Sequence, residues 1–236
     1  MTFLMMIHSL VCSNMIISFI GFMGCGKSSV GRKLSQLLCC PFMDLDEVIE
    51  EREGRTIPEI FSQDGEPAFR QIELDALKHV VLTLEPRQYA PLAPSHFVGP
   101  SPYAGVRKCQ FRTHASSPKE LQPEDGALVL ALGGGAVMTA ECAEIVHSET
   151  KCIYLRASVG TLIEHLEGQT ANRPLLNSTD CNSERAQRDE ESVLRDRITD
   201  LMAKRSSTYE NTAHIIIDID GKSIEAIASE IISRLG

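Results

Sequence analysis

The run IISFI at residues 16–20, followed at once by GFMGCGKS at residues 21–28, decides the fold. The apolar run is typical of a strand that is buried on both faces of a parallel sheet. The glycine-rich segment, called the phosphate loop below, matches G-x-x-x-x-G-K-S, a pattern whose backbone amides and following helix N-terminus face phosphate groups. In this pattern Lys27 would reach the outer phosphates of a nucleotide and Ser28 would bind Mg2+. An empty glycine-rich turn would require the strand, the lysine and the serine to coincide by accident.

Short apolar runs alternate with helical patterns along the rest of the chain, which predicts a parallel sheet covered by helices. The expected architecture is a three-layer α/β/α P-loop kinase fold with a five-stranded parallel sheet. The expected strands are residues 16–20, 41–44, 127–132, 152–156 and 214–219. The expected helices are residues 27–38, 66–82, 184–209 and 223–235, one that begins at Ser158, and one capped by Thr56 with Glu59 three residues later.

Two segments interrupt this alternation. Residues 84–125 contain seven of the eleven prolines and show no clear periodicity, and residues 168–183 are polar. The first segment precedes a strand and enters the sheet at its amino edge, whereas ligands of open parallel sheets bind at the carboxyl edge. We therefore expect it to be a passive insertion. The second follows the fourth strand and its helix, and we expect it to be a mobile lid over the phosphates.

Residues 1–14 are expected to be an extension outside the core. Residues 15–236 are expected to form a single domain that contains the insertion and the lid. Residues 1–26 contain no Asp, Glu, Lys or Arg, so a signal peptide or membrane span is an alternative. The missing basic region and the direct passage into the phosphate loop argue against it. Met15 stands where the first strand begins and is an alternative start of translation.

Composition excludes several classes of partner. The net charge is -9 and Lys and Arg do not cluster, which argues against nucleic acid. The eight cysteines show no paired C-x-x-C spacing, so a zinc site is not expected, and scattered thiols fit a reducing compartment. We expect a cytoplasmic protein with no membrane partner and, as a default, a monomer.

The second expected strand ends in an acidic pair, Asp44 and Asp46. Alternation along a strand would place both carboxylates on one face at the ligand-binding edge. One could then serve Mg2+ through water and the other a substrate hydroxyl. The alternative is that these residues simply begin the next helix, as acidic residues often do.

Three arginines and a triple glycine supply the remaining candidates. Arg70 lies on an expected helix beside an aromatic residue, and Glu73 one turn later could orient it. The glycines at residues 133–135 would allow a backbone to approach a ligand closely. Arg173 and Arg205 complete the basic set. Taken singly, these features also fit a surface ion pair, a tight turn and solvated arginines. Together they predict a kinase for a small hydroxylated acid.

These residues resemble the shikimate kinase family, over about residues 16–83 and 127–235. The motifs in order are Gly31-Arg32, Asp44-x-Asp46, G-R-x-I-x-x-I-F at 54–61, G-E-x-x-F-R-x-x-E at 65–73, G-G-G-A-V at 133–137, R-P-L-L at 173–176 and R-x-x-x-Y at 205–209. The resemblance implies transfer of phosphate from ATP to the 3-hydroxyl of shikimate. Two alternatives stay open, a related kinase such as gluconate kinase and a non-catalytic relative that binds nucleotide.

The resemblance also implies roles for particular residues. Asp46 would bind the shikimate hydroxyls and accept the 3-hydroxyl proton, and Arg173 would descend with the lid onto the transferring phosphate. The implied catalytic residues are Lys27, Asp46 and Arg173, and the implied Mg2+ residues are Ser28 and Asp44. The implied ATP-binding residues are Gly24, Cys25, Gly26, Lys27, Ser28, Ser29 and Arg173. The implied substrate-binding residues are Asp46, Phe61, Phe69, Arg70, Gly133, Gly134, Gly135 and Arg205.

The chain departs from the family at one position of interest. Members often carry a basic residue seven positions before the lid arginine, where it stacks on adenine. Leu166 occupies that place here, between His165 and Glu167. The resemblance therefore assigns no residue of this chain to the adenine contact.

Overall fold

The computed structural model describes residues 15–83, 127–166 and 190–235. Within them a five-stranded parallel sheet has the order β2-β3-β1-β4-β5, which confirms the expected sheet. The strands are β1 (Ile16–Ile20), β2 (Phe42–Asp44), β3 (Leu128–Ala131), β4 (Lys151–Arg156) and β5 (Ile215–Asp218). The expected extension, the whole expected insertion and the expected lid lie outside the described residues.

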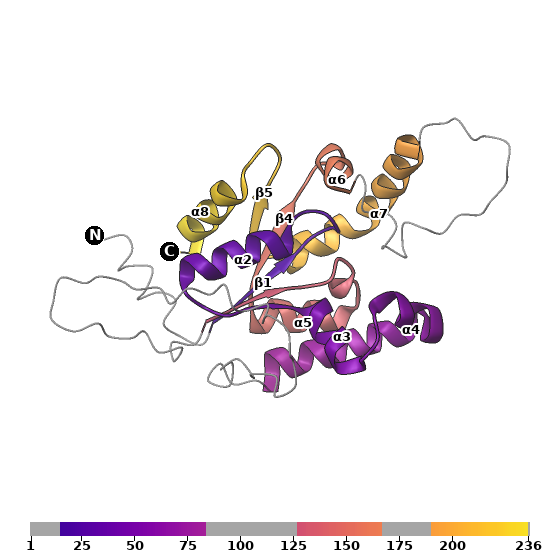
Figure 1. The fold of residues 1–236 in the computed structure, drawn as a ribbon. Helices are drawn as coiled ribbons and strands as arrows, with labels where there is room; N and C mark the ends of the chain where they lie inside the picture. The colour runs from indigo at the N-terminus through magenta and orange to yellow at the C-terminus, as the bar shows by residue number, and fades with distance from the viewer. Residues whose placement is uncertain (1–14, 84–126, 167–189, 236) are drawn as a thin grey trace, which may run out of the picture.

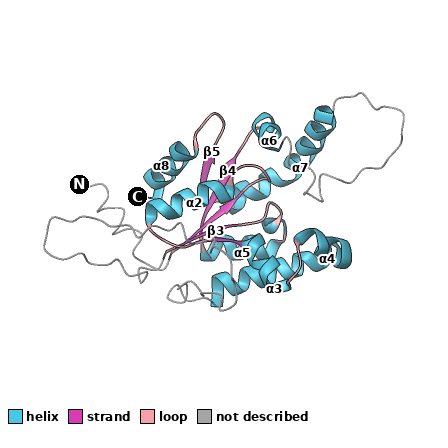
Figure 2. Ribbon diagram, viewed as in Figure 1, coloured by secondary structure: helices cyan, strands magenta, loops and turns pink. Residues whose placement is uncertain are grey.

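Helices cover both faces of the sheet (Figure 1). On one face lie α2 (Lys27–Leu38), α6 (Val159–Leu166) and α8 (Ile224–Leu235), and on the other lie α3 (Leu45–Glu53), α4 (Ile57–Lys78) and α5 (Ala140–Glu149). Helix α7 (Glu190–Thr212) reaches both, because Ile198 packs in the first cluster and Tyr209 in the second. Figure 2 shows the strands between these helices. A short π-helix, η1 (His79–Thr83), and a short 3-10 helix, η3 (Ala136–Met138), complete the fold. The three layers match the expected architecture.

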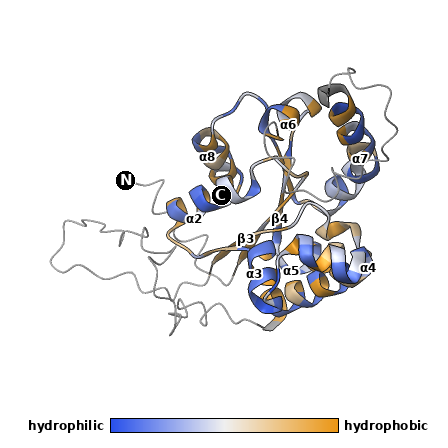
Figure 3. Cartoon of the chain, turned by 45° about the vertical axis from the view of Figure 1, so that its right-hand side comes forward, coloured by the Kyte–Doolittle hydropathy of each residue, from blue (hydrophilic) through white to orange (hydrophobic). Residues whose placement is uncertain are grey.

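Alternating apolar side chains of the strands build the two clusters. Ile17 and Phe19 of β1 pack under α2 and α8, while Ile16 and Ile20 face α3 and α4. All five residues of β1 are buried. Figure 3 shows the strands as apolar and the outer helices as mixed in hydropathy, which is the pattern of a sheet enclosed between amphipathic helices.

The helices differ from expectation at α3, α5 and α7. Helices α3 and α5 were not predicted as such. Helix α4 runs from Ile57, but Gly65 has a non-helical backbone (φ 81°, ψ 172°), so two helical pieces meet there, as the separate expected starts at Thr56 and Glu66 indicated. The Thr56 capping box is present, with the Thr56 amide donating to Glu59 at 2.8 Å. In the described part, α7 begins at Glu190 and continues to Thr212, three residues beyond the expected end at residue 209.

The prediction that Asp46 ends a strand was wrong. Strand β2 stops at Asp44, whose side chain accepts a hydrogen bond from the Asp46 amide (3.2 Å) and caps α3. Asp46 therefore lies in the first turn of α3. The alternative, that these acidic residues begin the next helix, is therefore what the structure shows. It still leaves both carboxylates at the carboxyl edge of the sheet.

The opposite, amino edge of the sheet carries a pair of histidines. His147 lies in the last turn of α5 and His214 precedes β5, and their rings stack with centroids 4.6 Å apart and an interplanar angle of 5°. The Cys152 amide donates to His214 Nδ1 at 3.1 Å. Thr83 and Leu128, which flank the expected insertion, end η1 and begin β3. None of the helices in the described part of the chain is both long and apolar enough to cross a membrane.

Candidate active site

The phosphate loop connects β1 to α2 and presents the start of that helix at the carboxyl edge of the sheet. Gly26 is the N-cap of α2, and the loop residue Cys25 is buried. The Lys27 ammonium donates to the carbonyls of Gly21 (2.9 Å) and Phe22 (3.0 Å), so its charge lies over the loop. The loop thus combines a helix N-terminus with a lysine, which suits polyphosphate.

Two oxygen donors meet at the foot of the loop. The Ser28 hydroxyl donates to Asp44 Oδ2 at 2.5 Å. A hydroxyl and a carboxylate are ligands of the kind that Mg2+ prefers, with waters and phosphates completing its shell. Among the described residues, no group of three or more His, Cys, Asp or Glu could hold a metal by itself. Ser28 and Asp44 therefore fit a Mg2+ that arrives with its nucleotide.

The Asp46 carboxylate lies in a crowded acidic environment. A Cβ at Gly133 would lie 2.8 Å from Asp46 Oδ1 and 2.9 Å from Glu73 Oε1, so both carboxylates flank this glycine. Burial, and then the negative charges of Asp44 and Glu73, raise the pKa of Asp46 to about 7, while the Lys27 charge opposes the shift. A carboxyl with such a pKa can exchange a proton near neutrality, as a general base must.

Arg70 lies on the other side of the triple-glycine turn (residues 133–135). It pairs with Glu73 at 2.7 Å and with Glu66 at 3.0 Å, and a Cβ at Gly135 would lie 2.5 Å from its Nη2. Glu73 is only 1% exposed, and burial raises its pKa although Arg70 and Arg205 oppose this. The predicted orientation of Arg70 by Glu73 is confirmed.

Two aromatic rings lie beside this arginine. Phe61 and Phe69 pack with ring centroids 4.5 Å apart, and the Arg70 guanidinium lies 5.3 Å from the Phe69 centroid. The rings belong to the two pieces of α4 on either side of Gly65. The break in the helix therefore brings an apolar surface next to the arginine.

Helix α7 adds two donors to a single carbonyl of the turn. Arg205 Nη1 donates to Gly134 O at 3.4 Å, and the Tyr209 hydroxyl donates to the same oxygen. The Arg205 guanidinium also lies 5.9 Å from the Phe22 ring centroid. A Cβ at Gly134 would lie 3.2 Å from the Met23 amide nitrogen. The turn is thus wedged between the phosphate loop and α7.

Helix α6 packs directly on the phosphate loop. His165 Nδ1 hydrogen-bonds to the Gly24 carbonyl at 2.8 Å. Leu166 is fully buried, and a Cβ at Gly24 would lie 2.9 Å from its Cγ. Leu166 therefore packs against the loop and does not present a face for a nucleotide base.

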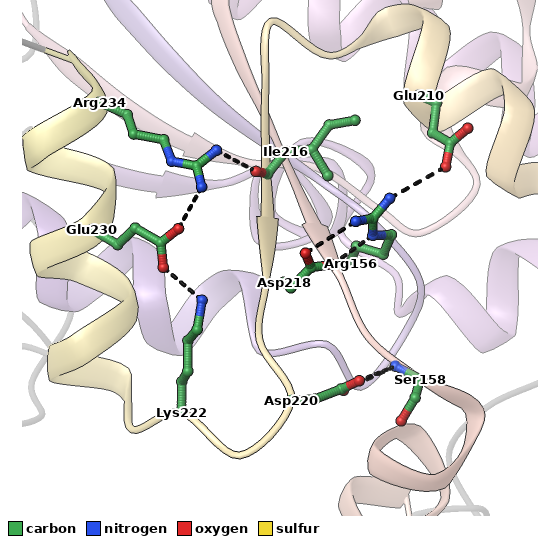
Figure 4. A network of polar contacts seen from close by, with 9 residues as sticks. All are labelled: Arg156, Ser158, Glu210, Ile216, Asp218, Asp220, Lys222, Glu230 and Arg234. Carbon is green, nitrogen blue, oxygen red and sulfur yellow. Dashed lines mark hydrogen bonds and ion pairs between the residues drawn. The ribbon is translucent and has the colours of Figure 1, made fainter.

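A polar network at the carboxyl ends of β4 and β5 fixes the start of this helix (Figure 4). Arg156 donates to both carboxylate oxygens of Asp218, at 2.5 and 3.0 Å, and lies 3.7 Å from Glu210 of α7. Asp220 accepts from the Ser158 amide at 2.9 Å. Strands β4 and β5 are thereby tied to α6 and α7 on the side that carries the phosphate loop.

The structure brings most predicted residues to one edge of the sheet: the phosphate loop, Asp44, Asp46, Phe61, Phe69, Arg70, residues 133–135 and Arg205. Arg173 lies outside the described residues. Sequence reasoning assigned no role to Tyr209, although its spacing of four residues from Arg205 puts both side chains on one helix face. It also missed His165, for which the sequence carries no signal beyond its place before Leu166.

Comparisons with known proteins agree with this arrangement. A family model described as shikimate kinase matches residues 23–84 and 109–236. A shikimate kinase of Dictyoglomus turgidum is 31% identical over 221 residues, which cover 93% of this chain and 96% of that protein. One from Pseudomonas savastanoi pv. phaseolicola is 33% identical, with 92% and 93% covered.

Solved structures give the same result. The shikimate kinase of Acinetobacter baumannii, in complex with shikimate, superimposes with a TM-score of 0.68 at 26% identity, covering 97% of this chain and 96% of that one. The enzyme from Bacteroides thetaiotaomicron gives 0.63 at 25% identity, with 94% and 96% covered. The sheet, the phosphate loop and the matched sequence thus lead to one conclusion: this chain belongs to the shikimate kinase family.

Proposed function

We propose that this chain transfers the γ-phosphate of MgATP to the 3-hydroxyl of shikimate, giving shikimate 3-phosphate and ADP, through the residues gathered around the triple-glycine turn. One observation carries the proposal. Asp46 flanks the turn at Gly133, and Arg70 and Arg205 flank it at Gly135 and Gly134. A base for a hydroxyl and two cations for a carboxylate therefore lie around one short turn beside the phosphate loop, which is what a hydroxy acid requires.

In this proposal the amides of residues 24–29 bind the phosphates of ATP, with Lys27 turning from the loop carbonyls to the outer phosphates. Ser28 and Asp44 would hold Mg2+, directly and through water. When bound, the ion neutralises phosphate charge during transfer. The 2.5 Å contact between the two side chains supports their assignment to one site.

Shikimate would lie between Asp46 and the two arginines. Asp46 binds the ring hydroxyls and takes the proton of the 3-hydroxyl as that oxygen attacks the γ-phosphorus and the bond to ADP breaks. Arg70, held by Glu73, and Arg205 bind the carboxylate, and Phe61 and Phe69 contact the ring. The backbone of residues 133–135 lines the site. Arg173 is assigned to the transferring phosphate, where closure over it would exclude water.

The proposal extends to the setting in which the enzyme acts. We assign it to the cytoplasm as a monomer, with no nucleic-acid or membrane partner. In the described part of the chain Cys25, Cys40, Cys142 and Cys152 are free thiols, which supports a reducing compartment.

The experiment that tests the function measures ADP release from MgATP with shikimate, with gluconate and without acceptor. Release that depends on shikimate is expected. Release with gluconate alone would reject the assignment of Arg70 and Arg205 to a shikimate carboxylate. A folded protein that binds ATP and releases no ADP would favour a non-catalytic relative.

The role of Asp46 has a separate test. Asp46→Asn keeps the size of the side chain and removes the base, so we expect phosphate transfer to be lost while the dissociation constant for ATP stays unchanged in an equilibrium titration. A loss of ATP affinity would contradict the assignment of Asp46 to the acceptor. Wild-type protein titrated in parallel is the control.

A further inference from the structure

The Gly134 carbonyl receives two donors from α7. The Tyr209 hydroxyl donates to it, and Arg205 Nη1 lies 3.4 Å away, at the long end of hydrogen-bond distances. A carbonyl oxygen has two lone pairs and can accept from both groups. Arg205 and Tyr209, one helical turn apart, therefore meet at one acceptor.

The position of the Tyr209 hydroxyl is set by packing and not by the turn. The side chain is 1% exposed, and its ring packs on Tyr154 of β4 with centroids 5.2 Å apart and an angle of 32°. Burial raises the pKa of Tyr209, so the hydroxyl stays protonated and remains a donor. A fixed phenol from the core thus determines where the Gly134 carbonyl lies.

This arrangement matters for Arg205, which is itself buried at 7% exposure. A buried guanidinium needs polar partners, because it loses water on burial. Among the described residues, the Arg205 guanidinium contacts the Gly134 carbonyl, the Tyr209 hydroxyl and the Phe22 ring. A guanidinium has five N–H donors, so these contacts leave donors for a carboxylate.

We propose that Tyr209 is a positioning residue for the acid end of the substrate: its hydroxyl donates to the Gly134 carbonyl and holds the Arg205 guanidinium beside it, where the guanidinium binds the shikimate carboxylate. This inference rests on the proposed function, which assigns Arg205 to that carboxylate. It assigns Tyr209 no contact with either substrate. A residue that merely stabilised the fold would change stability without acting on one substrate selectively.

The test is Tyr209→Phe, which keeps the ring and its packing on Tyr154. We expect KM for shikimate to rise about tenfold, the scale of one hydrogen bond to a charged group. The values of kcat and KM for ATP should stay near wild type. Tyr154→Phe, which removes the other hydroxyl of this tyrosine pair, is the matched control and should leave KM for shikimate unchanged. Equal changes in both KM values, or the same rise in the control, would overturn the proposal.

A double-mutant cycle with Arg205→Ala separates action through Arg205 from direct action. If Tyr209 acts through the guanidinium, Tyr209→Phe should add little once Arg205 is gone. An undiminished additional effect in the Arg205→Ala background would overturn the inference. Shikimate binding by calorimetry provides the same comparison without turnover. Wild-type protein that binds shikimate but does not phosphorylate it would contradict the proposed function alone, and protein that does not bind shikimate would contradict both.

Discussion

Asp46 shows how far a single residue could be predicted. The sequence indicated that it lies beside the phosphate loop, and it does. The reason given, alternation along a strand, was wrong, because the Asp44 side chain caps α3 and turns the chain into a helix one residue earlier. The proximity of Glu73, 27 residues later, depends on how α3, α4 and the turn after β3 pack together, which spacing along the chain cannot show.

The acidic surroundings of Asp46 predict a pH dependence. With a pKa raised to about 7, part of the free enzyme carries a protonated Asp46 at neutral pH, and the protonated carboxyl cannot accept the hydroxyl proton. We expect kcat/KM for shikimate to rise with pH through a midpoint near 7. In Asp44→Asn the midpoint should move to lower pH, because the negative charge of Asp44 contributes to raising this pKa. The measurement is the pH profile of kcat/KM for both proteins. A midpoint that stays in place would mean that another group titrates.

At the scale of elements, patterns predicted the strands better than the short helices. The five apolar runs correspond to β1–β5, whereas α3 and α5 escaped prediction. In α5 only Cys142 and Val146 are buried, so little periodicity marks it. The order of the strands and the packing of α6 on the phosphate loop depend on tertiary contacts. They could not be predicted from local sequence.

The packing of Leu166 on Gly24 predicts that α6 supports the loop. Leu166→Ala should open a cavity there and cost about 2 to 5 kcal/mol of unfolding free energy. It should also weaken ATP binding, since the loop loses contacts on one side. Denaturant unfolding and nucleotide titration measure the two effects. Leu37→Ala, at a position that is 48% exposed, is the control. If Leu166→Ala lowers stability and leaves ATP affinity intact, α6 does not support the loop.

At the scale of the molecule, the polarity of the sheet separates the two edges. The candidate site gathers at the carboxyl edge, whereas Thr83 and Leu128 flank the expected insertion at the amino edge, where the Leu128 amide donates to Met15 O at 3.1 Å. The family model also leaves residues 85–108 unmatched. The role of this segment and the boundaries of the single domain stay predictions.

Deletion of residues 86–122 tests that expectation. Because the flanking ends lie away from the phosphate loop, we expect the deletion protein to keep a specific activity near that of the full chain. Thermal unfolding of both proteins verifies that the shorter chain is folded. A large loss of activity in a folded deletion protein would show that the segment takes part in catalysis.

The stacked histidines at the amino edge make the stability of the whole molecule sensitive to acid. Burial and the neighbouring His147 and Lys151 lower the pKa of His214, whose Nδ1 accepts the Cys152 amide hydrogen in the neutral form. An unfolded chain binds that proton more readily. Stability should therefore be complete above pH about 6.5, the ordinary histidine value, and decline as pH falls toward the lower folded-state value. Urea unfolding midpoints between pH 8 and 5 should fall less steeply in His214→Gln than in wild type, and identical slopes would contradict this. Acidification would then lower the folding stability through a contact at the amino edge of the sheet, the edge opposite the candidate active site.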